Sequence, residues 1–281
     1  GERGDADDAV QRLRADLDTR AGRAMPRRLA DAVTAATRHD AAALAAVVLD
    51  PLLPLIGDRE LVVVPTGLLM TTPWAVLPGC AGRPVTVAPS ATAWLAAVRR
   101  RRATGTGPVT VVSGPGLALG DQEVRAVADL YAAAVVLTGT AATPAATLAA
   151  LDGASVAHLA AHGRHQAENA LFSTLELATG PVLGYDVQRL TRPPATVVLS
   201  SCELGLSDVR PGDESFGLAS ALLVAGTATV VASVSRVADD AAMAAMVTFH
   251  RAVVAGRSPA AALANSVSAD RAAGFVCLGA G

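Results

Sequence analysis

Two short segments of the sequence end in residues that together could cleave an amide bond. One apolar run closes with Ala160-Ala161-His162-Gly163, and another closes with Ser200-Ser201-Cys202-Glu203. An imidazole beside a thiol can accept its proton, and the resulting thiolate is the effective nucleophile. The backbone N–H groups of Gly163 and Cys202 could then hold the oxyanion of an acyl-transfer intermediate. The pattern predicts a His162/Cys202 dyad for acyl transfer, although a lone cysteine or histidine in such a run is more commonly a structural residue.

The other histidines fit this chemistry less well. His158 stands four residues before His162 and falls within the same apolar run, so we expect a buried hydrogen-bonding residue behind the base. His165 follows in the next loop and is the weaker alternative for the base. His39 and His250 lie in helical patterns and are predicted to face solvent.

The chain has three cysteines, Cys80, Cys202 and Cys277. An odd number without CxxC spacing favours neither a disulfide framework nor a zinc site. Cys277 sits inside an apolar strand and Cys80 in a loop without a base, so both are predicted to be inert packing residues. Such sparse thiols are typical of a reducing compartment, and we expect a cytoplasmic protein.

A glycine-rich loop, Ser113-Gly114-Pro115-Gly116-Leu117-Ala118-Leu119-Gly120, follows a predicted strand and precedes a predicted helix. Dinucleotide-binding loops occupy this position. Here, however, the spacing is GxGxxxG, and Pro115 removes a backbone N–H that a phosphate would need. A nucleotide-binding switch is therefore only a third hypothesis.

The elements that would position the dyad alternate regularly along the chain. Six helical patterns alternate with six apolar runs, which indicates βαβ units and a mostly parallel, three-layered sheet. Reactive groups in such sheets gather at the carboxyl ends of the strands. The predicted strands are 109–112, 135–137, 155–161, 196–201, 229–234 and 275–278, and the predicted helices are 92–101, 122–132, 143–151, 216–223, 239–254 and 259–270.

Segments outside this alternation are also predicted. Residues 60–64 and 85–87 are expected to be strands on either side of a Pro/Gly-rich loop. Residues 171–183, split by Gly180-Pro181, are expected to form a small projecting hairpin. In the N-terminal part of the chain, apolar residues recur at helical spacing up to about Val47, with a break at Pro26.

These patterns divide the chain into an N-terminal helical segment, residues 1–57, and an α/β domain, residues 58–281. The helical segment resembles the last units of a helical-repeat region. Because no initiator methionine is present, we expect the chain to be part of a longer protein.

Composition narrows the function further. The chain has 281 residues, of which 52% are hydrophobic and 3% aromatic, and its formal net charge is −2. Such a charge gives no electrostatic reason for nucleic-acid binding, and no apolar run is long enough for a membrane span. We therefore expect a folded protein that binds neither nucleic acid nor membrane.

From Leu61 onward the chain resembles the CHAT family, caspase-like peptidases that are related to caspases and separases and often follow tetratricopeptide repeats. The order and spacing of several stretches carry the resemblance. They are Val62-Val63-Val64-Pro65-Thr66-Gly67, Pro73-Trp74-Ala75-Val76-Leu77-Pro78, Ala88-Pro89-Ser90-Ala91-Thr92, Val156-Ala157-His158-Leu159-Ala160-Ala161-His162-Gly163, Val198-Leu199-Ser200-Ser201-Cys202-Glu203, Phe216-Gly217-Leu218-Ala219, Leu223-Val224-Ala225-Gly226-Thr227 and Val230-Val231-Ala232-Ser233-Val234.

The resemblance implies a caspase-like three-layer sandwich around a mostly parallel six-stranded sheet. It implies catalytic His162 and Cys202, an oxyanion hole at Gly163 and Cys202, and hydrolysis of a protein partner under the control of an upstream helical-repeat region or activator. No metal or organic cofactor is required. The family's tryptophans after residue 233 and near residue 273 are replaced here, which puts the usual substrate pocket in doubt.

Acidic residues just after the predicted strand ends suggest a substrate preference. A carboxylate at the base of the first pocket would favour a basic residue before the cut through a charge-assisted contact. Asp213 and Asp240 are the foremost candidates for this substrate-binding role. Loop acids are commonly just solvated, however, and Asp239 could merely cap the next helix.

Two functions from different classes therefore stand against each other. The first is a regulated cysteine endopeptidase, and the second is a catalytically silent CHAT domain that serves as a scaffold for partner proteins. Retention of both His162 and Cys202 favours the endopeptidase.

Overall fold

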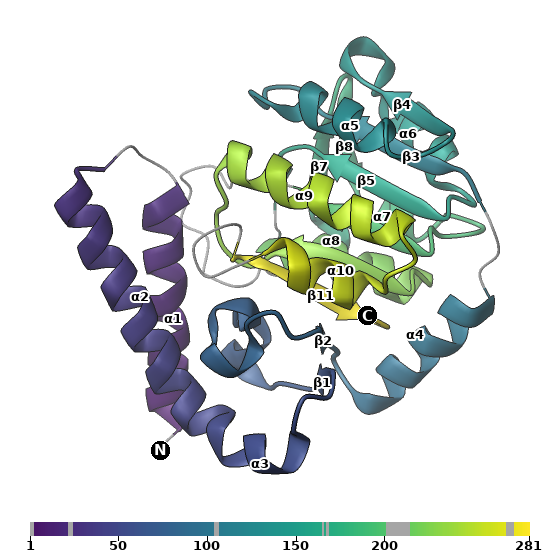
Figure 1. The fold of residues 1–281 in the computed structure, drawn as a ribbon. Helices are drawn as coiled ribbons and strands as arrows, with labels where there is room; N and C mark the ends of the chain where they lie inside the picture. Colours follow the sequence, from purple (N-terminus) through teal and green to yellow (C-terminus); the bar gives the residue numbers. More distant parts are fainter. Residues whose placement is uncertain are drawn as a thin grey trace.

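The computed structural model describes residues 3–21, 25–103, 107–164, 166, 169–200, 214–267 and 273–281. Its centre is an eight-stranded sheet with helices on both faces (Figure 1). The strand order is β1-β2-β11-β10-β9-β5-β3-β4, and every neighbouring pair is parallel except β10 and β11. The strands are β1 Leu61–Val63, β2 Val85–Val87, β3 Val109–Ser113, β4 Ala134–Leu137, β5 Val156–Ala160, β9 Thr196–Leu199, β10 Thr229–Ser233 and β11 Phe275–Gly279.

The mostly parallel three-layer architecture predicted from the sequence is confirmed, but the predicted six-stranded sheet is wrong in strand number. The strands expected around the Pro/Gly-rich loop join the same sheet, because β2 pairs in parallel with β11 through Thr86 and Cys277. Strands that are covered on both faces need mostly apolar sequence, and the central strands have it in runs that consist largely of Val, Ala, Thr and Leu, interrupted in β5 by His158.

The helices follow the predicted alternation closely. Among the described helices, three start with a side-chain cap: Ser90 accepts the Ala93 N–H at α4, Thr143 accepts the Ala146 N–H at α6, and Ser258 accepts the Ala261 N–H at α10. The helices are α1 Arg3–Ala21, α2 Arg27–Val48, α3 Leu53–Ile56, α4 Ala91–Ala103, α5 Gly120–Ala128, α6 Pro144–Leu151, α7 Gly184–Val187, α8 Glu214–Ala225, α9 Asp239–Val254 and α10 Pro259–Ser266.

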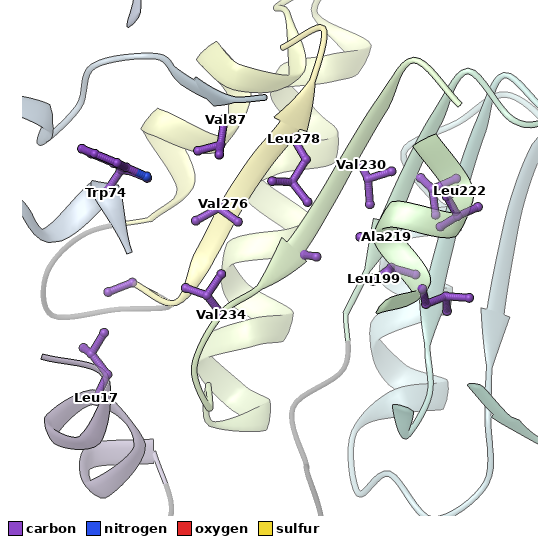
Figure 2. Packing of buried hydrophobic residues seen from close by; sticks show 14 of the residues in the cluster. Leu17, Trp74, Val87, Leu199, Ala219, Leu222, Val230, Val234, Val276 and Leu278 are labelled. Atoms are coloured by element: carbon purple, nitrogen blue, oxygen red, sulfur yellow. The ribbon is translucent and has the colours of Figure 1, made fainter. Parts of the chain in front are cut away.

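Each face of the sheet has its own hydrophobic cluster. On one face, Val198, Val231 and Phe275 pack with residues of α9 and α10. On the other face, the cluster joins the sheet to α8 and to the helical pair α1–α2. Figure 2 shows this second cluster, in which Leu199 and Val230 of the sheet lie beside Leu222 of α8.

The N-terminal helices are tied to the segment that follows β10. The buried Arg14 of α1 donates from Nε to the Val234 carbonyl at 2.7 Å, and the Arg236 N–H donates to Asp18 Oδ1 at 2.6 Å. These contacts place α1 beside the carboxyl end of a central strand.

The predicted hairpin is confirmed as part of a second, three-stranded antiparallel sheet. It consists of β6 Gly163–Arg164, β7 Thr174–Leu177 and β8 Gly180–Leu183, in that order. Because β6 begins right after His162, the small sheet is attached directly at the carboxyl end of β5.

Among the described residues, no single helix combines the length and apolar character of a membrane span. Only α2 taken together with residues 50–56, across a bend of 46°, meets both criteria.

Candidate active site

The ends of β5 and β9 lie side by side at the carboxyl edge of the sheet. The two strands are parallel neighbours in which Leu159 pairs with Leu199, and the Ser200 N–H donates to the Leu159 carbonyl at 2.9 Å. The adjacency of these two strands, which a His162/Cys202 dyad requires, is thus present in the sheet. Along the chain, His162 and Cys202 each stand three residues beyond this Leu pair.

His162 lies at the junction of the two sheets and is half-buried. Its carbonyl accepts the Glu176 N–H of β7 at 2.8 Å, which fixes the backbone just after β5. This bond flanks the Gly163–Leu175 pair, so these two residues face each other without exchanging hydrogen bonds. The ladder between β6 and β7 thus does not use the Gly163 N–H.

The glycine-rich loop after β3 packs against His162. A Cβ built on Gly116, which has φ +83°, would lie 3.3 Å from His162 Nε2. A Cβ on Gly114 would lie 2.6 Å from the Cβ of Ala161, and the Gly114 N–H donates to the Ala160 carbonyl at 2.8 Å. Close packing against the histidine segment therefore accounts for the glycines that resemble a nucleotide loop.

Several residues predicted for the site lie outside the described residues. They are Cys202, Asp213 and the alternative base His165. Asp240 is described and exposed in the first turn of α9, where its Oδ1 accepts the Ala241 N–H at 2.9 Å. The residue at the cap position of α9 is Ala238, so the expectation that Asp239 caps this helix is wrong.

The remaining cysteines behave as expected for packing residues. Cys80 and Cys277 are both 1% exposed. Burial raises the pKa of the Cys80 thiol to about 11 and that of Cys277 to about 12, although Arg83 and Arg101 oppose this rise. Neither thiol is therefore available as a thiolate near neutral pH.

The prediction that His250 faces solvent is wrong, whereas His39 is exposed as predicted. His250 is fully buried, and its Nε2 lies 3.1 Å from Nδ1 of the fully buried His158. Its Nδ1 lies 2.7 Å from the hydroxyl of Tyr131. His250 occupies the inward face of α9 one turn after Met246, a spacing that could have identified it from the sequence. The hydrogen-bonding role expected for His158 is confirmed.

This buried polar chain continues to the end of β9 through a residue that sequence reasoning missed. Glu123 is 5% exposed and Ser200 2%. The Ser200 hydroxyl donates to Glu123 Oε1 at 2.6 Å, and His158 Nε2 lies 3.1 Å from the same oxygen. Glu123 shares the inward face of α5 with Val124 and Val127, and a carboxylate at an apolar position of a helix was the available signal.

The burial of His250 predicts how stability depends on pH. Burial, and then the neighbouring His158, lower the pKa of His250 well below its usual value. The unfolded chain therefore binds a proton that the folded protein does not. As pH falls below about 6.5, the free energy of unfolding should decrease by up to about 1.4 kcal/mol per pH unit.

Urea unfolding from pH 7.5 to 5 would measure this slope in the wild type and in His250→Gln. We expect the pH dependence to be shallower in His250→Gln and unchanged in His39→Gln, which alters an exposed histidine. Equal slopes in all three proteins would contradict the assignment of His250 as a buried neutral residue.

No group of three or more His, Cys, Asp or Glu side chains suited to hold a metal ion occurs among the described residues.

Solved structures with the same architecture are caspase-like cysteine peptidases. The separase–securin complex of Saccharomyces cerevisiae matches with a TM-score of 0.59 and 14% identity over 79% of this chain and 16% of that chain. The complex of the pro- and mature domains of Porphyromonas gingivalis RgpB matches with a TM-score of 0.55 and 15% identity over 99% and 77%. The Arg-specific cysteine proteinase gingipain R matches with a TM-score of 0.53 and 15% identity over 74% and 57%. The chain thus has a cysteine-peptidase fold of the caspase-like class.

The sequence itself assigns the family. The CHAT domain model matches residues 38–269, so the chain belongs to the CHAT domain family. No curated protein matches the sequence. The chain spans little more than half of gingipain R and a sixth of the separase chain.

Proposed function

We propose that this protein is a cysteine endopeptidase that cleaves a protein partner through His162 and Cys202. The observation that carries the proposal is the parallel pairing of β5 with β9. Leu159 and Leu199 are paired, and along the chain the histidine and the cysteine each follow three residues later. Membership of the CHAT family and the caspase-like fold support the same chemistry.

The proposed reaction has two steps, acylation of Cys202 and hydrolysis of the resulting thioester, and both the histidine and the cysteine take part in each step. His162 takes the proton from the Cys202 thiol, and the thiolate attacks the scissile carbonyl. The N–H groups of Gly163 and Cys202 stabilise the oxyanion. Collapse of the tetrahedral intermediate breaks the C–N bond as His162 returns the proton to the leaving amine. Water, deprotonated by His162, then hydrolyses the thioester and releases the free thiol and the new carboxyl end.

A preference for a basic residue before the cut is part of the proposal. The exposed Asp240 lies in the first turn of α9, which follows the carboxyl end of β10, and Asp213 precedes α8 in the sequence. One similar structure is that of a proteinase described as Arg-specific. A carboxylate that lines the first pocket would bind arginine through paired, charge-assisted hydrogen bonds.

Regulation from the N-terminal side is also proposed. Arg14 and Asp18 of α1 bond to the backbone just after β10, which is the neighbour of β9. A protein that displaces or pulls α1 would therefore act on a strand end next to the proposed site.

A free thiol nucleophile suits a reducing compartment, so a cytoplasmic location belongs to the same proposal.

Cleavage of a protein-derived peptide library, with the cut sites mapped by mass spectrometry, tests this function against the scaffold alternative. We expect cuts after arginine or lysine that disappear in Cys202→Ala, and Asp213→Ala or Asp240→Ala should weaken the basic preference. Cuts that persist in Cys202→Ala would contradict the dyad. Absence of cuts together with no labelling of Cys202 by a peptidyl electrophile would favour the scaffold.

A further inference from the structure

We propose that Glu123 is a positioning residue that holds the ends of β5 and β9 at the separation that the His162/Cys202 dyad needs. This inference rests on the proposed function. One buried oxygen of the Glu123 carboxylate on α5 contacts both His158 of β5 and Ser200, which directly follows β9.

Oε1 of Glu123 connects the two strands directly. It accepts the Ser200 hydroxyl hydrogen bond at 2.6 Å, and it lies 3.1 Å from Nε2 of His158 on β5. The N–H of this imidazole does not point straight at the oxygen, so the contact with His158 is mainly electrostatic. Ser200 also bonds β5 through its backbone, by donation to the Leu159 carbonyl. It stands two residues before Cys202, and His158 stands four before His162.

The position of each proton in the chain follows from its far end. Burial raises the pKa of the Tyr131 phenol to about 12, and this hydroxyl can donate to His250 Nδ1 in the one set of proton positions that also directs an N–H of His158 at the Glu123 carboxylate. His250 Nε2 then carries a proton and donates to His158 Nδ1. His158 consequently carries its proton on Nε2, which faces Glu123. The contact from His250 of α9 thereby fixes the ring of His158, and the contacts from His158 and Ser200 fix the Glu123 carboxylate.

Stability alone does not explain this arrangement. A buried carboxylate and two buried imidazoles are costly to desolvate, and apolar residues of similar volume usually stabilise such a site equally well or better. A chain of directional polar contacts differs from apolar packing because it restricts the relative placement of its members. Here His158 lies on β5, Ser200 directly follows β9, and Glu123 and His250 lie on the helices α5 and α9.

Kinetics of the full chain can separate positioning from stability. A shift of about 1 Å in reacting groups costs about a hundred-fold in rate. We therefore expect Glu123→Ala to lower kcat about a hundred-fold with little change in KM. Glu123→Gln keeps an acceptor for Ser200 and should recover most of that loss, while Ser200→Ala should resemble Glu123→Ala.

Thr110→Val is the matched control, because Thr110 is fully buried on β3 and its hydroxyl donates to the Ala150 carbonyl, away from the two strand ends. It should lower Tm without changing kcat.

A second readout needs no peptidase activity. In a His162→Cys background, mild oxidation should form a disulfide with Cys202, and peptide mapping can follow its rate. We expect this rate to fall at least several-fold when Glu123→Ala or Ser200→Ala is added and to remain unchanged with Thr110→Val.

Each possible result either supports or contradicts the positioning role of Glu123. Slower cross-linking, together with no wild-type cleavage and no labelling of Cys202 by a peptidyl electrophile, would support the positioning role and reject the proposed peptidase. Normal cleavage with unchanged kcat and cross-linking in both variants would overturn the positioning role. Failure of the His162→Cys background to cross-link would also overturn it, because the strand ends would then not meet. If Glu123→Ala does not fold, Ser200→Ala and Glu123→Gln give the same comparison.

Discussion

The His162→Ala substitution is expected to lower kcat/KM for peptide cleavage about a thousand-fold, within the range by which general acid–base groups accelerate reactions. Without the imidazole, no neighbouring base would take the proton of Cys202, and an unassisted thiol is a thiolate only to a small extent at neutral pH. The leaving amine would also lose its proton donor. Steady-state kinetics on a peptide identified by the library would measure the loss.

The pH dependence of His162→Ala adds a second signature. Raising the pH ionises the thiol without a base, so the variant should regain part of its acylation rate at alkaline pH. His39→Ala, the same substitution at an exposed position of α2, should leave the kinetics unchanged. Full activity in His162→Ala would contradict the dyad, and loss of activity in His165→Ala would then assign the base to that residue.

The Gly114→Ala substitution is expected to destabilise the protein by about 3 kcal/mol, the upper part of the usual range for overpacking a core. The new Cβ would lie 2.5 Å from the Glu176 carbonyl oxygen and 2.6 Å from the Cβ of Ala161. Neither atom is the flexible end of a side chain, so the backbone would have to move. That movement would reach His162 as well, whose carbonyl is bonded to the Glu176 N–H.

Urea unfolding measures this change in free energy, with Gly4→Ala as the control. Gly4 lies in α1, and a Cβ added there meets no atom within 4 Å. The control should be neutral or slightly stabilising, because alanine favours a helix more than glycine does. If Gly114→Ala unfolds at the same urea concentration as the wild type, the loop after β3 is not held against β7 as described.

The sequence was sufficient for features that depend on local pattern. Alternating apolar and amphipathic segments predicted the order of the central strands and helices, and α9 was predicted with its observed bounds of Asp239–Val254. The break at Pro26 between two helices was also predicted, because proline cannot continue the hydrogen bonding of a helix. The sequence predicted that His162 and Cys202 each follow a strand, and the structure shows that these strands, β5 and β9, are parallel neighbours.

Features that depend on distant partners were missed. The segments now assigned to β1 and β2 were recognised as strands, but no local pattern shows that β2 pairs with β11. The helical pattern around His250 predicts a residue that faces solvent, whereas its partners His158 and Tyr131 come from other elements. Glu123 was passed over for the same reason, since its contacts with Ser200 and His158 exist only after α5 packs on the sheet.

The central place of β11 has a consequence for how the protein is made. β11 is the only link between the β1–β2 pair and the other strands of the described sheet, and it pairs with β2 and β10 on its two sides. During translation, β1 and β2 leave the ribosome long before the strand that joins them to β10. Closing so long a loop is slow compared with forming local contacts, and the open edge of β2 stays exposed until then. Completion of the sheet is thus a late folding event, and chaperone binding to nascent chains that end before residue 275 would be stronger than to chains that include β11.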